Sequence, residues 1–301
     1  MEYKYDVIIC GAGPAGLTAA IYSARANLKT LIIEKSVAGG LTAISSNIEN
    51  FPGFKRIDGF TLCQNMLESA LNFGAEIAYE EIVNLDLKNK KIQATGNIYT
   101  AKTVIICLGV TPRKLNVPGE NDFIGRGISF CATCDGAFFK SKVTAVVGGG
   151  NSAFENALYL SKICRKVYLI HRNETFKAYA DLINSVKKSE NVEFILNSAV
   201  TGISGNEKLE EITILKNGIK RNLKTDGLFI SVGYIPNTLE LDLQKDENGY
   251  ILADENTQTS KSGVFVAGDI RRKNVRQIIT ACSDGAIAAT SAFDFIELNH
   301  K

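Results

Sequence analysis

The sequence predicts an α/β fold of two three-layer domains, with the second domain inserted into the first. Two glycine-rich turns support this prediction, because each follows a short apolar run and precedes a helical pattern; they occupy residues 11–16 and 148–153. A third observation is an apolar run near the C-terminus that ends in Gly268-Asp269 and precedes another helical pattern. Strand, glycine turn, helix and strand in this order indicate Rossmann-like nucleotide-binding units.

Composition excludes several classes of protein. The length of 301 residues suits two domains, and 45% apolar with 22% charged residues is typical of a globular chain. The 34 basic and 32 acidic residues leave a net charge of +2, so neither nucleic acid nor an anionic membrane is an expected partner. No apolar stretch reaches the roughly 18 residues that cross a bilayer, and a strand-like run begins at residue 5, which leaves no room for a signal peptide. We therefore expect a cytoplasmic protein.

The N-terminal unit carries a complete dinucleotide fingerprint. Its strand, helix and second strand are expected over 5–10, 15–26 and 30–33. Gly11 and Gly13 allow the tight turn and bring backbone N–H groups close to a pyrophosphate, while Gly16 lets the helix pack against the sheet. Glu34 follows 23 residues after Gly11 and is expected to accept hydrogen bonds from ribose hydroxyls.

The pattern repeats in the middle of the chain. Strands are expected over 143–147 and 166–170, with a helix over 152–161 between them. The intervening turn reads Gly148-Gly149-Gly150-Asn151-Ser152-Ala153. Where the first unit has its acid, this unit has His171 and Arg172, and a cation there pairs with a 2′-phosphate and favours NADPH over NADH. Two different nucleotides indicate a flavin and its nicotinamide reductant.

The C-terminal segment returns the chain to the first domain. The run 263–269 reads as a buried strand ending in Gly268-Asp269, and a helix is expected over about 276–298. Such a turn presents a carboxylate and a helix N-terminus to the ribityl and pyrophosphate region of FAD. The expected domains are a first part of the FAD domain over 1–115, an NAD(P)H-binding-like domain with a cysteine pair over 116–242, and the second part of the FAD domain over 243–301.

Seven cysteines are present, and only Cys131 and Cys134 form a spaced pair. The odd number and the scatter of the other five argue against the disulfide framework of a secreted protein. A two-residue gap indicates redox or metal chemistry, but zinc needs further soft ligands, and the chain has only His171 and His300. No metal is therefore expected, and Asp135 is the candidate general acid beside the pair.

Across essentially its whole length the sequence resembles the low-molecular-weight thioredoxin reductase family. The most specific match is Cys131-Ala132-Thr133-Cys134-Asp135-Gly136. Further matches are Gly39-Gly40, Glu49-Asn50-Phe51-Pro52-Gly53, Leu108-Gly109, Gly233, Pro236-Asn237, Gly268-Asp269 and Arg276-Gln277.

The resemblance implies cofactors, partners and residue roles. It implies a homodimer with a thioredoxin-like protein as electron acceptor, in which Cys134 faces the flavin and Cys131 attacks the partner's disulfide. It also implies two alternating orientations of the domains. The residues implied for FAD are Gly11, Gly13, Pro14, Ala15, Gly16, Glu34, Gly39, Gly40, Leu41, Asn50, Gly109, Gly268, Asp269, Arg276, Gln277 and Ile278. Those implied for NADPH are Gly148, Gly150, Asn151, Ser152, His171, Arg172 and Lys177.

The sequence departs from the family pattern where NADPH is bound. The usual His-Arg-Arg-x-x-x-Arg stretch is replaced over 171–177, with Asn173 and Lys177 in place of two arginines and with Glu174 adding a negative charge. Lysine cannot form the planar bidentate pair that arginine forms with phosphate. Asn156 also replaces a commonly acidic residue, and Leu41 stands where glutamine is frequent near the flavin. These changes weaken a 2′-phosphate site without abolishing it.

The sequence is therefore compatible with two electron donors. NADPH is favoured, because losing one bidentate contact costs about 1.5–3 kcal/mol and not all of the binding. The alternative is the ferredoxin-dependent flavin thioredoxin reductase branch, which keeps the fold and the cysteine pair but takes electrons from ferredoxin. A ferredoxin–NADP reductase-like enzyme lacks such a pair, so Cys131 and Cys134 argue against it. A flavin-bearing sensor is the non-enzymatic alternative.

Overall fold

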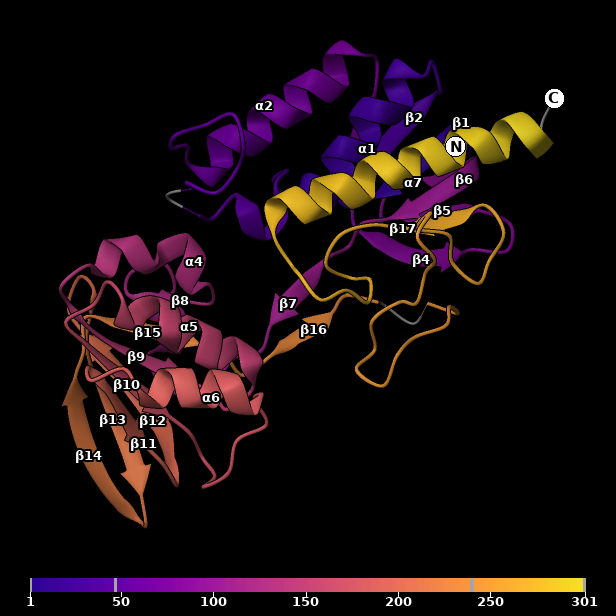
Figure 1. The fold of residues 1–301 in the computed structure, drawn as a ribbon. Helices are drawn as coiled ribbons and strands as arrows, with labels where there is room; N and C mark the ends of the chain where they lie inside the picture. Colours follow the sequence, from indigo (N-terminus) through magenta and orange to yellow (C-terminus); the bar gives the residue numbers. More distant parts are fainter. Residues whose placement is uncertain (1, 46–47, 239–240, 300–301) are drawn as a thin grey trace. The chain divides into compact units, whose positions relative to one another are not determined.

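The computed structural model describes residues 2–45, 48–238 and 241–299, and it divides into two compact units (Figure 1). Unit 1 comprises Met1–Thr111 with Ile235–Lys301, and unit 2 comprises Pro112–Tyr234. The expected divisions after residues 115 and 242 lie four and eight residues beyond the observed ones after 111 and 234. The difference arises because the chain crosses within two strands, β7 (Val110–Pro112) and β16 (Tyr234–Pro236), which pair with each other.

Unit 1 is built on a mainly parallel sheet. In the described residues the strand order is β3-β2-β1-β6-β5-β4, and β17 pairs with the free part of β6. The strands are β1 (Glu2–Cys10), β2 (Thr30–Glu34), β3 (Glu76–Tyr79), β4 (Ile82–Asp86), β5 (Lys91–Ala94), β6 (Ile98–Ile106) and β17 (Val264–Val266). Cys10 lies opposite both Ile33 and Ile106, so the carboxyl ends of three parallel strands meet at one edge. Ligands of open α/β sheets bind outside that edge.

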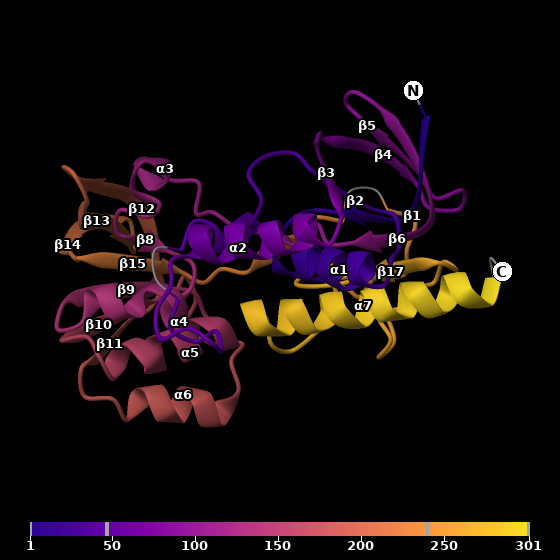
Figure 2. The same cartoon turned by 90° about the horizontal axis from the view of Figure 1, so that it is seen from above.

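Three helices cover one face of this sheet: α1 (Pro14–Arg25), α2 (Gly59–Asn72) and α7 (Ile278–Asn299). Figures 1 and 2 show α1 and α7 side by side, and the two helices pack directly on each other. Val7 and Ile9 point to this helical face, whereas Ile8 and Cys10 point to the opposite face. The other face is covered by the β4–β5 hairpin and by apolar side chains from 241–270. A strand buried on both faces reads as a continuous apolar run, as β1 does.

Unit 2 repeats this plan at smaller size. Its parallel sheet has the order β11-β10-β9-β15-β8. The strands are β8 (Ile128–Ser129), β9 (Val143–Val147), β10 (Lys166–Ile170), β11 (Val192–Ile195) and β15 (Gly227–Ile230). Helices α5 (Asn151–Ser161) and α6 (Ala180–Lys187) pack on one face. An antiparallel sheet of β12 (Ser198–Gly205), β13 (Leu209–Lys216) and β14 (Ile219–Lys224) packs on the other.

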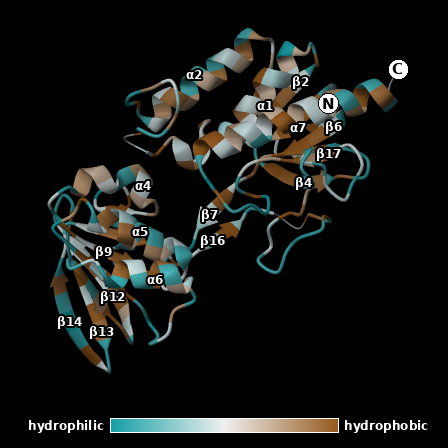
Figure 3. Cartoon of the chain, in the orientation of Figure 1, coloured by the Kyte–Doolittle hydropathy of each residue, from teal (hydrophilic) through white to brown (hydrophobic). Residues whose placement is uncertain are grey.

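The α/β class and the two Rossmann-like units are thus confirmed, with the predicted strands and helices displaced by at most a few residues. Figure 3 shows β6 and β17 as hydrophobic strands and the edge strand β14 as largely hydrophilic. Short helical segments are η1 (Gly40–Thr42), α3 (Glu120–Phe123), α4 (Ala132–Asp135) and η2 (Gly136–Phe139). Within the described residues, none of the helices combines the length and apolarity needed to cross a membrane.

Candidate functional site

The first glycine-rich turn joins β1 to α1 and is shaped by backbone contacts. Gly11 has φ +102°, and a Cβ there would lie 2.6 Å from the Cys107 carbonyl oxygen. A Cβ on Gly16 would lie 1.9 Å from the Gly11 carbonyl oxygen. A Cβ on Gly13, by contrast, would have no described atom within 4 Å. Gly11 and Gly16 therefore close the turn, while Gly13 leaves the backbone at the start of α1 open to a ligand.

Glu34 ends β2 beside this turn. One carboxylate oxygen accepts the Ala12 N–H at 2.9 Å, and the other accepts the Ser36 N–H at 3.0 Å. The second oxygen also accepts the Ser36 hydroxyl at 3.4 Å, whereas the oxygen bonded to Ala12 keeps a lone pair for a further donor. The position suits the ribose role that the sequence predicts for Glu34.

Three further segments predicted for FAD meet near the turn. The Gly39 N–H donates to the Ala12 carbonyl at 2.7 Å, and a Cβ on Gly40 would lie 3.6 Å from the Gly13 Cα. The Asn50 side chain donates to the Gln277 side chain at 3.0 Å across 227 positions of sequence. The structure thus brings together segments that are widely separated in the chain. Leu41 lies in η1 and is exposed. Gly109 has φ +63°, and its carbonyl oxygen accepts the Asn237 N–H. The remaining predicted residues lie at the starts of α1 and α7: Pro14, Ala15 and Ile278.

Asp269 supplies the strongest indication of a ligand in unit 1. Its Oδ1 atom is buried and has no hydrogen-bond partner among the described residues. Burial raises the pKa of the Asp269 carboxyl, and the charges of Lys273 and Arg276 act in the opposite direction. The Arg276 guanidinium lies 4.1 Å from the Tyr250 ring centroid, and its Nε donates to the Asp269 carbonyl at 3.4 Å. A buried acceptor without a donor fits a ligand hydroxyl.

These features fit FAD. The open backbone at Gly13 and the N-terminus of α1 suit a pyrophosphate, Glu34 suits a ribose, and the unpaired Asp269 oxygen suits a hydroxyl of the ribityl chain.

The cysteine pair forms a disulfide in unit 2. Cys131 and Cys134 are bonded, with their Cα atoms 5.3 Å apart, and α4 begins immediately after Cys131. Both cysteines are half-buried, whereas Ala132 between them is buried. The pair therefore sits at the surface of the unit on a short helical turn, where a second disulfide has access to sulfur.

Asp135 lies directly beside this disulfide. Its N–H donates to the Cys131 carbonyl at 3.1 Å, and its Oδ2 accepts the Ser129 hydroxyl at 2.6 Å. Burial raises the pKa of the Asp135 carboxyl, while the bond from Ser129 lowers it. A carboxyl whose pKa is raised in this way holds a proton closer to neutral pH, as a general acid requires.

Ser129 was not predicted as a site residue. Its hydroxyl donates to Asp135 and also accepts the Cys131 N–H at 3.1 Å, so it links the acid to the cysteine. The only signal in the sequence is a hydroxyl between two apolar residues, Ile128 and Phe130, and that pattern has no specific interpretation.

The other five cysteines lie away from any such arrangement. Cys10, Cys63, Cys107 and Cys164 are buried, and Cys282 is half-buried. Burial raises the pKa of Cys10 to about 12. Cys10 and Cys107 are thus small core residues. No group of three or more possible metal ligands occurs in the described residues, which exclude His300.

In the second glycine turn, as in the first, one glycine closes the turn and another leaves the backbone open. A Cβ on Gly148, which has φ +152°, would lie 2.3 Å from the Ser231 carbonyl oxygen, whereas a Cβ on Gly150 would meet no described atom within 4 Å. Gly150 is the N-cap of α5, and Ser152 is exposed in its first turn. The Asn151 side chain accepts the Tyr179 N–H at 2.9 Å. An anion at the start of α5 would therefore meet open backbone.

His171 packs on this turn instead of projecting from it. A Cβ on Gly149 would lie 2.2 Å from the His171 ring, and the His171 Nε2 lies 3.1 Å from the Thr175 carbonyl oxygen. Burial lowers the pKa of His171, so its ring is neutral at neutral pH. Arg172 and Lys177 are exposed, and the Lys177 N–H donates to the Gly149 carbonyl at 2.8 Å. The cations available for a phosphate are therefore Arg172 and Lys177.

A disulfide beside a carboxylic acid and two nucleotide-type turns define a disulfide oxidoreductase. Residues 5–285 match the model of the pyridine nucleotide-disulphide oxidoreductase family, and the chain belongs to that family.

Individual relatives narrow the comparison. The chain is 44% identical to the thioredoxin reductase of Bacillus subtilis (strain 168), over 98% of this chain and 96% of that protein. The crystal structure of thioredoxin reductase from Streptococcus pyogenes MGAS5005 matches with a TM-score of 0.88 and 38% identity, over 98% of this chain and 99% of that one. A ferredoxin-flavin thioredoxin reductase from Clostridium acetobutylicum matches with a TM-score of 0.55 and 27% identity, over 99% and 100% of the two chains.

Proposed function

We propose that this protein reduces the disulfide of a thioredoxin-like protein with electrons from NADPH, through FAD and the Cys131–Cys134 pair. The observation that carries the proposal is the Cys131–Cys134 disulfide with Asp135 hydrogen-bonded beside it. Relatives at 42–44% identity over almost the whole chain bear the name thioredoxin reductase, which supports the same substrate class here.

Unit 1 would hold FAD through the open backbone at Gly13, the carboxylate of Glu34 and the unpaired oxygen of Asp269. Asn50 and Gln277, already joined by a hydrogen bond, would form part of the same cradle. FAD, when bound, supplies the electron pair that opens the Cys131–Cys134 disulfide.

The chain's own residues then carry out thiol–disulfide exchange. The Cys131 thiolate attacks one sulfur of the partner's disulfide; that S–S bond breaks, a mixed disulfide forms, and the other partner sulfur leaves with a proton from Asp135. The Cys134 thiolate next attacks the Cys131 sulfur of the mixed disulfide; the bond to the partner breaks, the Cys131–Cys134 disulfide forms again, and the second partner sulfur leaves as a thiolate. Asp135 suits the proton transfers because its pKa is raised and Ser129 orients it.

NADPH is the donor that we propose. Gly150 and the N-terminus of α5 would face its pyrophosphate, and Arg172 and Lys177 are the exposed cations for its 2′-phosphate. Ferredoxin is the alternative donor, and the neutral Asn173 within the cationic stretch is the feature that favours it. The ferredoxin-flavin relative, at 27% identity, is more distant than the named thioredoxin reductases.

Stopped-flow flavin reduction tests the proposal and separates the donors. Anaerobic holoprotein is mixed with NADPH or with reduced ferredoxin, and flavin absorbance and then disulfide reduction are followed. We expect NADPH to reduce the flavin within one turnover, which lowers its absorbance. A thioredoxin disulfide should then reoxidise the flavin and restore the absorbance. Bleaching by ferredoxin alone would assign the other donor. A flavin that neither donor reduces would indicate a sensor.

We also propose a homodimer in the cytoplasm, which the resemblance to the low-molecular-weight thioredoxin reductase family implies. Light scattering on the purified holoprotein gives the mass directly. A monomer at micromolar concentration would contradict the dimer.

A further inference from the structure

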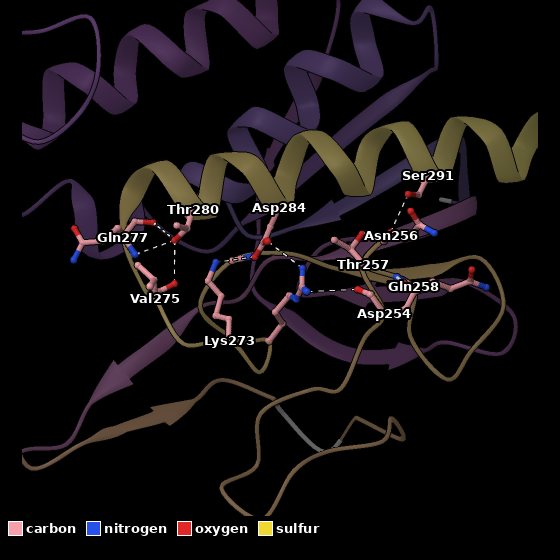
Figure 4. Close-up of polar contacts among 12 residues, drawn as sticks. Asp254, Asn256, Thr257, Gln258, Lys273, Val275, Gln277, Thr280, Asp284 and Ser291 are labelled. Atoms are coloured by element: carbon pink, nitrogen blue, oxygen red, sulfur yellow. Dashed lines mark hydrogen bonds and ion pairs between the residues drawn. The ribbon is translucent and has the colours of Figure 1, made fainter. Parts of the chain in front are cut away.

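A buried carboxylate, Asp284, occupies the second turn of α7. Asp284 is 8% exposed, and its two oxygens accept three hydrogen bonds. Oδ1 accepts from Arg271 Nη1 at 3.0 Å, and Oδ2 accepts from Lys273 Nζ at 2.8 Å and from the Gly268 N–H at 3.0 Å. Figure 4 shows Asp284 and Lys273 pointing toward each other below α7. Asp284, Arg271 and Lys273 form what we call the Asp284 cluster.

The cluster is too buried to be an ordinary surface ion pair. The side chains of Arg271, Lys273 and Asp284 are 16%, 11% and 12% exposed. Buried ion pairs contribute little net stability, because removing the charges from water offsets their attraction. Two cations also face a single carboxylate, so the cluster keeps one positive charge. A cluster of this kind is better explained by what it positions than by the stability that it adds.

The group that it positions is the Gly268-Asp269 turn. Gly268 has φ +82°, and a Cβ there would lie 2.9 Å from the Cβ of Ala15. On α7, a Cβ on Gly285 would lie 2.2 Å from the Ala15 carbonyl oxygen. Ala15 at the start of α1 is therefore in close contact with both the turn and α7. The hydrogen bond from the Gly268 N–H to Asp284 links the turn to α7.

Members of the Asp284 cluster act in opposite directions on the pKa of Asp269, which burial raises. The Lys273 ammonium acts on both carboxyls, as the partner of Asp284 and as a charge that opposes the effect of burial on the pKa of Asp269. The Asp284 carboxylate adds to the effect of burial on the pKa of Asp269, whereas Lys273 favours the ionised form of Asp269, which offers only acceptors.

We propose that Asp284, with Arg271 and Lys273, is a positioning residue for the flavin: it holds the Gly268 N–H and so fixes the turn that presents the unpartnered Asp269 Oδ1 to a ligand hydroxyl. This inference rests on the proposed function, in which unit 1 binds FAD.

The test compares Asp284→Asn with Asp294→Asn in the full-length chain. Asp294 is an exposed aspartate on the same helix, so the second variant makes the same chemical change outside the cluster. FAD is removed, the dissociation constant for FAD is measured by titration, and deuterium exchange of the peptide containing Gly268 is measured before and after FAD is added. We expect Asp284→Asn to weaken FAD binding at least about tenfold and to speed exchange in that peptide. Asp294→Asn should change neither.

The outcomes separate positioning from folding. If Asp284→Asn does not fold, Lys273→Gln keeps the Arg271–Asp284 pair and should still weaken FAD binding about threefold or more. Unchanged FAD affinity in the folded Asp284 or Lys273 variant overturns the inference, and so does an equal loss in Asp294→Asn. Failure of the wild-type chain itself to bind FAD would instead refute the proposed function together with this inference.

Discussion

Replacing Gly16 by alanine is expected to damage the first nucleotide turn through the fold itself. The added Cβ would lie 1.9 Å from the Gly11 carbonyl oxygen, whereas ordinary contact begins at 3.4 Å, so the two backbones must separate by about 1.5 Å. Overpacking of this kind costs about 1–3 kcal/mol. Because the neighbour is backbone and cannot rotate away, we expect Gly16→Ala to lower the free energy of unfolding by about 3 kcal/mol. At about 2–4 °C per kcal/mol for a domain of this size, the Tm should fall by about 6–12 °C.

Gly13→Ala is the matched control. A Cβ at Gly13 meets no described atom within 4 Å, and its φ of −72° is open to any residue. The FAD-free protein should therefore keep its stability within about 0.5 kcal/mol. FAD binding should nevertheless weaken at least about tenfold, because the methyl group occupies the space that the pyrophosphate approaches.

Thermal unfolding of the FAD-free proteins and FAD titration separate the two effects. The reasoning is refuted if Gly16→Ala leaves the Tm of the FAD-free protein unchanged. It is equally refuted if Gly13→Ala binds FAD as tightly as the wild type, since the open space would then have no function.

Three other predictions concern unit 2. Cys131→Ser and Cys134→Ser should each abolish thioredoxin turnover while leaving FAD affinity unchanged, as steady-state assays and FAD titration will check; residual turnover above a few per cent would contradict the exchange mechanism. Asp135→Asn should slow turnover about 100-fold. Burial raises the pKa of Asp135 in the folded state, so the stability linked to its proton is present at low pH and is lost as pH rises through that raised pKa. Asp135→Asn should therefore raise the Tm at neutral pH. A lower Tm at pH 7 would contradict this reasoning. Asn173→Arg should lower the KM for NADPH about tenfold with little change in kcat, and Arg172→Gln should raise it by a similar factor; if neither variant changes KM, these positions do not contact the 2′-phosphate.

Much of the fold could be predicted from short-range patterns. The strand–turn–helix order around Gly11 and around Gly148 is encoded within some 25 residues each, and the structure reproduces it with small shifts of boundary. The Cys131–Cys134 pair is likewise local, because two intervening residues suffice to bring the sulfurs together. The expected divisions between the units lie four and eight residues beyond the observed ones, because the crossings are strands rather than irregular linkers.

His171 shows what a local pattern leaves out. In the sequence it stands at the end of a strand beside Arg172, as a cation for a phosphate would. In the structure its ring packs against Gly149 and Phe176, and burial lowers its pKa. Solvent exposure decides whether an imidazole carries charge, and exposure depends on residues that are distant in the chain.

The sequence by itself determined the α/β class, the two nucleotide-type turns and the redox pair, because each depends on residue types at fixed short spacings. Tertiary structure alone decided that Ser129 holds Asp135, that Asn50 meets Gln277, and that Asp284 holds the turn before Asp269. It also decided that an Asp269 oxygen is buried without a partner among the described residues. Hydrogen bonds and burial join side chains by distance in space, which residue spacing along the chain does not encode.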